Sequence, residues 1–196
     1  MDRMVTLAHK FLEDVLSFGD TAVDLTAGGG RDTLFLAERT GRQGKVFAFD
    51  IQREAIVRTQ SLLTGKGFRA ISHWEEGSIL PESGIFLVND GHERIRSYVR
   101  EKVKGVIANL GYLPSGDRSI VTRAETTLQS LRETLPLLVS GGRLAVIAYV
   151  RHQGGRREAE EISGFFGGLP SNCWHTIKME MLNRENAPFL LMAEKT

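Results

Sequence analysis

The stretch VDLTAGGGRDTLFLA, from Val23 to Ala37, runs from an apolar segment through three consecutive glycines into a pattern typical of a helix. The glycines at 28–30 let the backbone approach a ligand closely, because no Cβ atoms stand in the way. Free N–H groups at the following helix start, near Asp32 and Thr33, suit a negative or polar ligand. This pattern is typical of the first strand and helix of an open α/β sheet, where ligands bind beyond the carboxyl ends of the strands.

Composition limits the class of protein. The chain has 196 residues, 41% of them apolar, which is enough for one sizeable core, so we expect a single domain over residues 1–196. A formal net charge of +1 excludes a protein that is held to nucleic acid by bulk charge, although a local basic patch remains open. Cys173 is the single cysteine, and no Cys/His cluster has zinc-ligand spacing, so we expect neither a disulfide nor a metal site.

The N-terminal segment predicts a helix and not a targeting signal. It lacks a secretory apolar region, and no run elsewhere approaches the roughly eighteen apolar residues that a membrane span needs. Apolar residues from Val5 to Leu16 follow helical spacing, which predicts that residues 1–19 form a helix packed on the core. We therefore expect a cytoplasmic protein with no membrane association.

Short apolar, β-branched runs then alternate with helical patterns, which predicts an α/β fold with a doubly wound, seven-stranded, mostly parallel sheet. Only a short turn, 182–188, joins the last two strands, so they should form a C-terminal antiparallel hairpin. The segment Gly65–Gly84 has no clear period and receives no predicted structure. The predicted strands are Ala22–Leu25, Lys45–Asp50, Ile85–Asn89, Gly105–Leu110, Leu144–Val150, His175–Met181 and Phe189–Ala193. The predicted helices after the N-terminal one are Asp32–Arg39, Arg53–Leu63, Glu93–Val99, Ile120–Leu138 and Arg156–Phe166.

A carboxylate follows the glycines at a spacing that favours a nucleoside-containing cofactor. Asp50 lies twenty residues after Gly30 and ends the second predicted strand, where it can accept hydrogen bonds from both hydroxyls of a ribose. The alternative is that the glycines only make a tight turn and that Asp50 caps the next helix. A nicotinamide fingerprint fits poorly, because Thr33 occupies the position of its last small residue, and no hydride-acceptor site is evident for a dehydrogenase.

Two motifs resemble those of methyltransferases. Asp24, Gly28 and Gly30 match D-x-x-x-G-x-G, which resembles motif I of the S-adenosylmethionine-dependent enzymes. Further on, NLGYLPSGD begins at Asn109, and its first four residues resemble the (N/D)-P-P-(Y/F) motif of enzymes that methylate amino nitrogens. That resemblance implies that the side-chain carbonyl of Asn109 and the next backbone carbonyl accept hydrogen bonds from the target amine, and that Tyr112 packs over the target group. The alternative is that this stretch only shapes a turn.

Taken together, DLTAGGGRDTLFLA, FAFDIQ, NDGHE, NLGYLPSGD followed by TRAETTLQSL, and AYVRHQGG resemble a family of small bacterial proteins first described as rRNA methylases. Members of that family are understood as tRNA 5-aminomethyluridine methyltransferases. The resemblance implies a Rossmann-like methyltransferase fold and S-adenosylmethionine as cofactor. It also implies N-methylation of the 5-aminomethyl group of the wobble uridine in the tRNA anticodon, which gives 5-methylaminomethyl(-2-thio)uridine.

The motifs, the strand ends and the resemblance together give the expected site residues. Those expected to bind the cofactor are Asp24, Thr26, Ala27, Gly28, Gly30, Asp32, Thr33, Asp50, Ile51, Gln52, Asp90, Gly91, His92, Asn109 and Leu110. Those expected to be catalytic are Asn109, Tyr112 and His152. Those expected to bind the substrate are Leu110, Gly111, Tyr112, Arg118, Arg123, Arg151, Arg156 and Arg157.

The reaction requires a neutral amine. An alkylammonium with a pKa near ~10 must lose a proton before it can attack a methyl group. His92 and His152 are the candidate titrating groups, because histidine alone has an unperturbed side-chain pKa near neutrality. For His92 we favour a different role, lining the adenine pocket beside Asp90, and His152 has the alternative of bonding a loop.

The arginines would form a basic rim around the amine site, where phosphate contacts position an RNA. The alternative is that they form surface ion pairs of little energetic value with Glu125, Glu158, Glu160 and Glu161. A homodimer could supply further RNA-binding surface. Methylation of rRNA or of a small molecule, and a cofactor-binding module without activity, remain as alternative functions, although the Asn-Leu-Gly-Tyr sequence disfavours the last.

Overall fold

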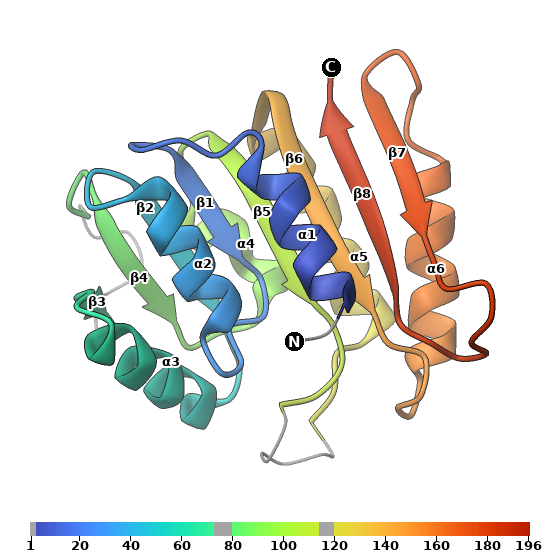
Figure 1. Cartoon of the computed structure of the whole chain (residues 1–196), viewed down its shortest axis with the longest axis horizontal. Helices are drawn as coiled ribbons and strands as arrows, with labels where there is room; N and C mark the ends of the chain where they lie inside the picture. Colours follow the sequence, from blue (N-terminus) through green and yellow to red (C-terminus); the bar gives the residue numbers. More distant parts are fainter. Residues whose placement is uncertain (1–2, 73–79, 114–119) are drawn as a thin grey trace.

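The computed structural model describes residues 3–72, 80–113 and 120–196 and shows an α/β protein built on one sheet (Figure 1). In the described residues the sheet has eight strands in the order β3-β4-β2-β1-β5-β6-β8-β7. The strands are β1 (Thr21–Asp24), β2 (Lys45–Phe49), β3 (Ala70–Ile71), β4 (Gly84–Val88), β5 (Val103–Asn109), β6 (Leu138–Ala148), β7 (Trp174–Met179) and β8 (Phe189–Lys195). The helices are α1 (Arg3–Glu13), α2 (Arg31–Thr40), α3 (Arg53–Gly65), α4 (Ile95–Tyr98), α5 (Ala124–Thr134) and α6 (Gly155–Gly167), with short 3₁₀ helices η1 (His92–Arg94) and η2 (Leu135–Leu137).

The strand order reverses at β1: β2, β4 and β3 lie on one side of it, and β5, β6, β8 and β7 lie on the other. Strand β1 pairs in parallel with β2 on one side and with β5 on the other, and β2 and β5 pair in parallel with β4 and β6. Strand β8 lies antiparallel between β6 and β7, which confirms the predicted C-terminal hairpin. The carboxyl ends of β1, β2 and β5 therefore meet at one edge of the sheet, at the point where ligands bind in open α/β folds.

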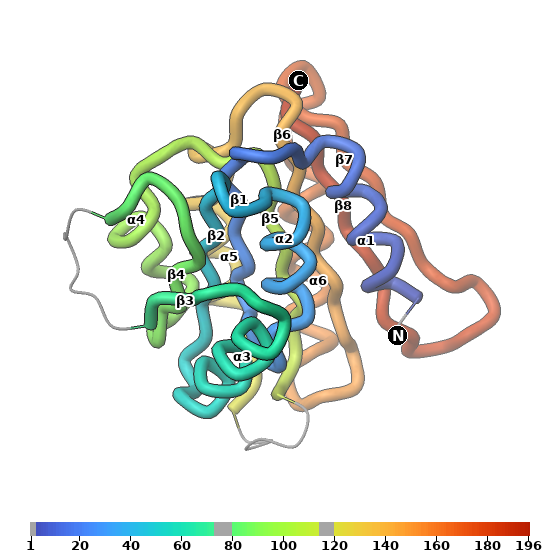
Figure 2. Tube along the Cα trace, turned by 60° about the vertical axis from the view of Figure 1, so that its left-hand side comes forward, coloured from blue at the N-terminus to red at the C-terminus, as the bar shows by residue number. Residues whose placement is uncertain are grey.

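Helices cover both faces of the sheet (Figures 1 and 2). On one face α1, α2 and α3 pack through buried side chains such as Leu12, Leu36 and Leu63. On the other face α5 and α6 pack through side chains such as Leu131 and Phe166. The inner strands β2 and β5 are mostly apolar and buried on both faces, and this is the pattern from which the sequence predicted a parallel sheet.

The structure corrects several predicted bounds. The sheet has eight strands and not seven, because Ala70–Ile71 pairs in parallel with β4 inside the segment that received no prediction; residues 73–79 of that segment lie outside the described residues. The predicted helix Ile120–Leu138 is wrong at both ends, since α5 spans Ala124–Thr134 and a 3₁₀ turn at Pro136 leads into β6 at Leu138. The N-terminal helix is shorter than residues 1–19, and the predicted helix Glu93–Val99 is divided between η1 and α4.

Within the described ranges, no helix has the length and the apolar character that crossing a bilayer requires.

Candidate active site

The loop between β1 and α2 carries the three glycines to the carboxyl edge of the sheet, beside the ends of β2 and β5 (Figure 1). Gly28 and Gly30 have positive φ values of 52° and 82°. A Cβ atom at Gly30 would lie 2.8 Å from the Cα atom of Thr59 on α3, closer than real contacts allow. Glycine is therefore needed at position 30 both for its backbone conformation and for the close approach of α3.

Asp50 connects this loop to the end of β2. Its carboxylate accepts hydrogen bonds from the backbone N–H groups of Gly28 and Gln52, each at 2.9 Å. Burial raises the pKa of Asp50, and these two hydrogen bonds oppose the rise. The side chain of Ile51 is 59% exposed, which places an apolar surface directly beside the carboxylate. Asn89, which the sequence did not single out as a site residue, supports this corner by donating from its amide to the carbonyls of Asp50 and Ile51 at 2.9 and 3.1 Å.

Asp24 at the end of β1 bonds residues on both sides of the glycine loop. It is completely buried and accepts hydrogen bonds from the Thr33 hydroxyl at 2.6 Å and from the Thr26 N–H at 2.9 Å. Desolvation by burial, followed by the nearby carboxylate of Asp32, raises the pKa of Asp24 to about 7. The side chains of Asp24 and Thr33 thus bond each other, and their contribution to a cofactor site is to shape the loop.

Asp32 links α2 to the end of β5. One carboxylate oxygen lies 2.6 Å from Nε2 of His9 on α1, and the other accepts a hydrogen bond from Nδ2 of Asn109 at 3.2 Å. The backbone N–H of Asn109 donates to the Thr26 hydroxyl at 2.7 Å. His9 stacks on Phe35 with ring centroids 3.9 Å apart, and nothing in the sequence pattern distinguished it from the other residues of the N-terminal helix.

The segment after β4 brings Asp90, Gly91 and His92 to the same edge. The carboxylate of Asp90 accepts hydrogen bonds from the Gly91 N–H at 2.8 Å and from Arg94 and Tyr98, each at 2.6 Å. His92 directs Nδ1 toward the Leu25 carbonyl at 3.1 Å, so Nδ1 carries the proton, because a carbonyl oxygen can only accept. Burial lowers the pKa of His92, which favours the neutral ring.

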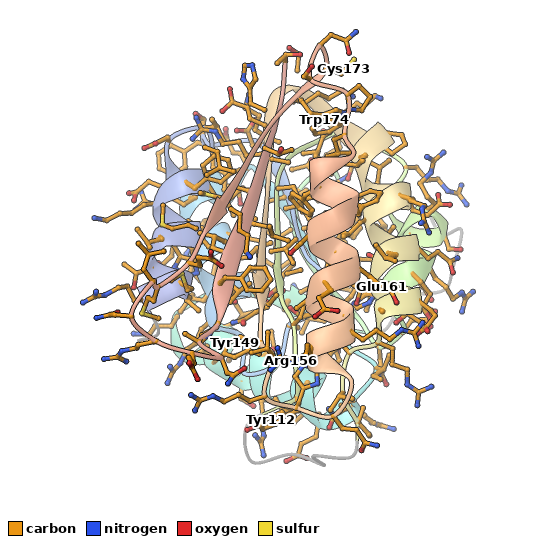
Figure 3. All side chains as sticks on the ribbon, turned by 90° about the vertical axis from the view of Figure 1, so that its right-hand side faces the viewer. Tyr112, Tyr149, Arg156, Glu161, Cys173 and Trp174 are labelled. Carbon is orange, nitrogen blue, oxygen red and sulfur yellow. The ribbon has the colours of Figure 1, made fainter. Side chains whose placement is uncertain are left out.

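The Asn-Leu-Gly-Tyr sequence leaves β5 as a turn with defined partners. Gly111 has φ +132°, and both of its backbone groups bond Thr122: its N–H donates to the Thr122 hydroxyl and its carbonyl accepts from the Thr122 N–H, each at 2.9 Å. Tyr112 forms an isolated antiparallel bridge with Val121. The Tyr112 side chain is 45% exposed, and it lies at the same end of the molecule as Tyr149 and Arg156 (Figure 3).

Glu158 on α6 lies behind this turn. It is only 2% exposed and accepts hydrogen bonds from the hydroxyls of Thr122 at 2.7 Å and Thr127 at 2.6 Å. Its position contradicts the alternative that it is a surface partner of the arginines. Nε2 of His152 is buried at 3.8 Å from the Glu158 carboxylate and has no hydrogen-bond partner among the described residues, while Nδ1 lies 3.1 Å from the Gln153 carbonyl. Thr122 and Thr127 lie in TRAETTLQSL, which carried part of the family resemblance, so only that resemblance pointed to this region.

The predicted basic rim is largely engaged within the protein. Arg151 donates to the backbone carbonyls of Asn186 and Glu185, and Arg156 donates to the Asn186 side chain at 2.7 Å, so both hold the turn between β7 and β8. Arg157 pairs with Glu161 at 2.6 Å and with Glu125 at 3.0 Å. Arg123 is exposed at the N-cap of α5, and Arg118 lies outside the described residues.

These elements form a site that fits the predicted cofactor. A glycine loop, the carboxylate of Asp50 and an exposed apolar surface at Ile51 lie around one switch point of the sheet. The amide of Asn109 uses its N–H to bind Asp32, so its oxygen is the atom left to accept a hydrogen bond from a substrate. Such an arrangement can hold a nucleoside cofactor on one side and a hydrogen-bond donor such as an amine on the other.

Comparisons with known proteins match the chain to methyltransferases. Residues 46–195 match the rRNA methylase family. The chain is 38% identical over 196 residues to the chloroplastic tRNA (mnm(5)s(2)U34)-methyltransferase of Arabidopsis thaliana, with 96% of this chain and 68% of that protein covered.

Solved structures resemble the chain over its full length. A crystal structure of an rRNA methylase from Clostridium thermocellum matches with a TM-score of 0.88 and 36% identity, covering 100% of this chain and 99% of the other. A methyltransferase from Streptococcus mutans, crystallised in complex with S-adenosylhomocysteine (SAH), matches with a TM-score of 0.84 and 33% identity over 100% and 99% of the two chains.

Proposed function

The chain belongs to the rRNA methylase family and is an S-adenosylmethionine-dependent methyltransferase, and from this premise we propose that it methylates the 5-aminomethyl group of the wobble uridine in tRNA. The product would be 5-methylaminomethyluridine or its 2-thio form. The Arabidopsis relative, whose name contains the same modified nucleoside, supports this substrate. We further propose that residues 1–196 act as one domain, while cytoplasmic location and the homodimer stay predictions.

The orientation of Asn109 is the observation that carries the proposal. Its Nδ2 donates to Asp32, so Oδ1 is available as an acceptor for an amine N–H. Asn109 is the last residue of β5, which neighbours β1 in the sheet, so an amine bound there would lie beside a cofactor on the glycine loop. An acceptor at this position suits a nitrogen nucleophile, because it can orient the N–H groups and leave the lone pair free to react.

The cofactor supplies an electrophilic methyl group on a sulfonium. Asp50 would bind its ribose hydroxyls, the loop at 27–30 would lie along its methionine portion, and Ile51 would pack on its adenine. Asp24, Thr26 and Thr33 would act by shaping the loop, since their polar groups bond one another or the chain. Among the residues after β4, Asp90 is bonded to Arg94 and Tyr98, so Gly91 and His92 are the better candidates for contact with the cofactor.

Tyr112 and His152 would serve the substrate. The half-exposed ring of Tyr112 can stack on a uracil that is turned out of the anticodon loop. His152 is the candidate to take the proton from the ammonium form of the substrate. Its Nδ1 is directed at a carbonyl and its Nε2 is buried, so the imidazole would have to turn to bring Nε2 to the amine. Arg123, Arg151 and Arg156 would contact phosphates at the rim of the same edge.

A defined substrate tests this function directly. Purified protein and S-adenosylmethionine should convert tRNA carrying 5-aminomethyluridine to the methylated form, as detected by mass spectrometry of its nucleosides. The same tRNA with unmodified uridine, rRNA and small primary amines serve as controls. Transfer to rRNA or to free amines, without transfer to the modified tRNA, would replace the proposed substrate with one of the two alternatives.

A further inference from the structure

Glu158 is a buried carboxylate for which neither the cofactor site nor the amine site accounts. It lies on α6, is 2% exposed and receives two hydroxyl donors, Thr122 and Thr127, at 2.7 and 2.6 Å. A buried carboxylate is costly to the fold unless its oxygens are hydrogen-bonded, and here each oxygen has a donor. Neighbouring acidic residues such as Glu161 lie on the outer side of the same helix and pair with Arg157.

The Thr122 hydroxyl has a fixed direction because of Glu158. A hydroxyl carries one hydrogen, and Thr122 donates it to the Glu158 carboxylate. The lone pairs of Thr122 Oγ1 are then left to accept the N–H of Gly111 at 2.9 Å. The Gly111 N–H therefore donates to the Thr122 hydroxyl, and this hydroxyl donates to the Glu158 carboxylate. Because the carboxylate takes the hydroxyl hydrogen, the Thr122 oxygen acts as the acceptor for Gly111.

This chain of hydrogen bonds holds the turn that would carry the amine. Thr122 also donates its own N–H to the Gly111 carbonyl at 2.9 Å, and Val121 bridges Tyr112. Gly111 has φ +132°, a conformation that glycine adopts easily and a residue with a side chain does not. The backbone between Asn109 and Tyr112 is thus fixed from α6 through one hydroxyl.

We propose that Thr122 and Glu158 are positioning residues for methyl transfer, which rests on the proposed function of the Asn109 turn. Glu158 orients the Thr122 hydroxyl, and Thr122 holds the backbone of Gly111. The acceptors of the amine and the ring of Tyr112 thereby stay in the geometry of the near-attack complex. Thr127 bonds the same carboxylate but has no hydrogen bond to the described residues of the turn, so it belongs to the packing of α5 on α6.

Three substitutions separate positioning from packing. Thr122→Val removes the hydroxyl at nearly constant volume and should lower kcat by about 10- to 100-fold, the cost of a displaced reacting group, with little change in cofactor affinity. Thr122→Ser keeps the hydroxyl and should restore most of the rate. Thr127→Val, the matched control, removes the other donor to Glu158 and should reduce thermal stability as much or more while lowering kcat far less. Equal losses of kcat in Thr122→Val and Thr127→Val, or no rescue by Thr122→Ser, would overturn the proposal.

A double-mutant cycle tests whether Glu158 acts through Thr122. If it does, Glu158→Ala should lower kcat in the parent but cause little further loss in the Thr122→Val background, whereas multiplying effects would show an independent role and overturn the proposal. If Glu158→Ala does not fold, Glu158→Gln, which keeps the side-chain volume, replaces it in the cycle.

Hydrogen exchange at one amide gives a readout without substrate. The Gly111 N–H should exchange faster in Thr122→Val than in the parent and Thr127→Val, because its acceptor is gone. Unchanged exchange at Gly111 overturns the positioning role by itself. A parent protein that fails to methylate the modified tRNA overturns the proposed function instead, so the two failures are distinguishable.

Discussion

Asp50 is the carboxylate whose role in the site can be tested by binding of the cofactor. We expect Asp50→Ala to weaken S-adenosylmethionine binding, because each lost charge-assisted hydrogen bond contributes on the order of 1.5–3 kcal/mol. Part of the loss would come from the loop, since Asp50 also holds the Gly28 N–H. Calorimetry on folded protein measures the change. Asp20→Ala, which removes a carboxylate that bonds the Ser17 N–H before β1, is the control, and equal affinity in both variants would exclude Asp50 from the site.

Asn109 should matter to the transfer step and not to the cofactor. Asn109→Ala is expected to leave S-adenosylmethionine affinity nearly unchanged while slowing transfer, because a lost acceptor loosens the orientation of the amine. Tyr112→Ala should also slow transfer, and it should weaken tRNA binding by about 1–3 kcal/mol if the ring stacks on a base. Single-turnover methylation of the modified tRNA, with cofactor affinity measured in parallel, separates these effects. If both variants transfer the methyl group at the parent rate, the Asn-Leu-Gly-Tyr stretch has only the structural role of a turn.

Asp24 gives a prediction about stability and pH. Its pKa is raised from 3.8 to about 7 by burial and by Asp32, so between these values the folded protein holds a proton that the unfolded chain releases. Binding of this proton to Asp24 contributes to the free energy of unfolding. The contribution is complete below the Asp24 pKa of the unfolded chain, and it is lost as the pH rises through the Asp24 pKa of the folded protein. Asp24→Asn cannot ionise, so its free energy of unfolding relative to the parent should increase from pH 4 to 7. Denaturant unfolding across this range is the measurement, and a constant difference would contradict the raised pKa.

Among the helices, strands and turns, the sequence predicted those that depend on the local pattern of residues. Continuous apolar runs predicted the buried parallel strands, and the glycine loop predicted the strand-to-helix turn at Gly30, because both properties follow from neighbours in the chain. The two-residue β3 was missed since it has no room for a period. The helix over Ile120–Leu138 was extended too far because its apolar residues continue into β6, where pairing with β5 determines the structure.

Contacts between distant elements could not be predicted in this way. The pairs formed by His9 with Asp32 and by Thr122 with Glu158 join residues 23 and 36 positions apart. Nothing in the spacing of Glu158 distinguishes it from exposed Glu160, since only the packing of α6 against α5 buries one and not the other. The positions of Asp50 and Asn109, by contrast, follow from the rule that parallel strands end at one edge.

The turn between β7 and β8 yields a prediction at this scale. Arg151 and Arg156 hold it through Asn186 and Glu185, and Asn186 has the positive φ of 55°. Replacing both arginines with Ala should therefore speed hydrogen exchange in residues 182–188, because the turn loses its side-chain contacts to the β6–α6 loop and to the first turn of α6. Arg157→Ala, which removes pairs with Glu125 and Glu161 only, is the matched control. Equal exchange in the double variant and the control would show that the turn keeps its conformation without these arginines.

In the whole molecule, helices cover both faces of the sheet, and the candidate site lies at the carboxyl edge of its strands. The sheet is covered by α1 to α3 on one face and by α4 to α6 on the other, so the carboxyl edge is where the glycine loop, the Asn109 turn and the arginines are brought together (Figures 1 and 2). With a net charge of +1, the molecule as a whole exerts little attraction on an RNA at long range. Binding of tRNA must then depend on cations near this edge.

The salt dependence of tRNA binding tests this view of the molecule. If Arg151, Arg156 and Arg157 neutralise phosphates of a single-stranded anticodon loop, log affinity should fall with log salt, and replacing all three with Ala should reduce that slope by roughly 0.7 for each lost contact. We expect Arg157 to contribute least, because Glu125 and Glu161 already compete for its guanidinium. Cofactor affinity should stay the same. Arg132→Ala, a change in the last turn of α5, where the guanidinium lies over Phe165, controls for a general loss of charge. A triple variant with the slope of the parent would mean that these arginines serve the β7–β8 turn and surface pairs alone, and that the RNA is held by other groups.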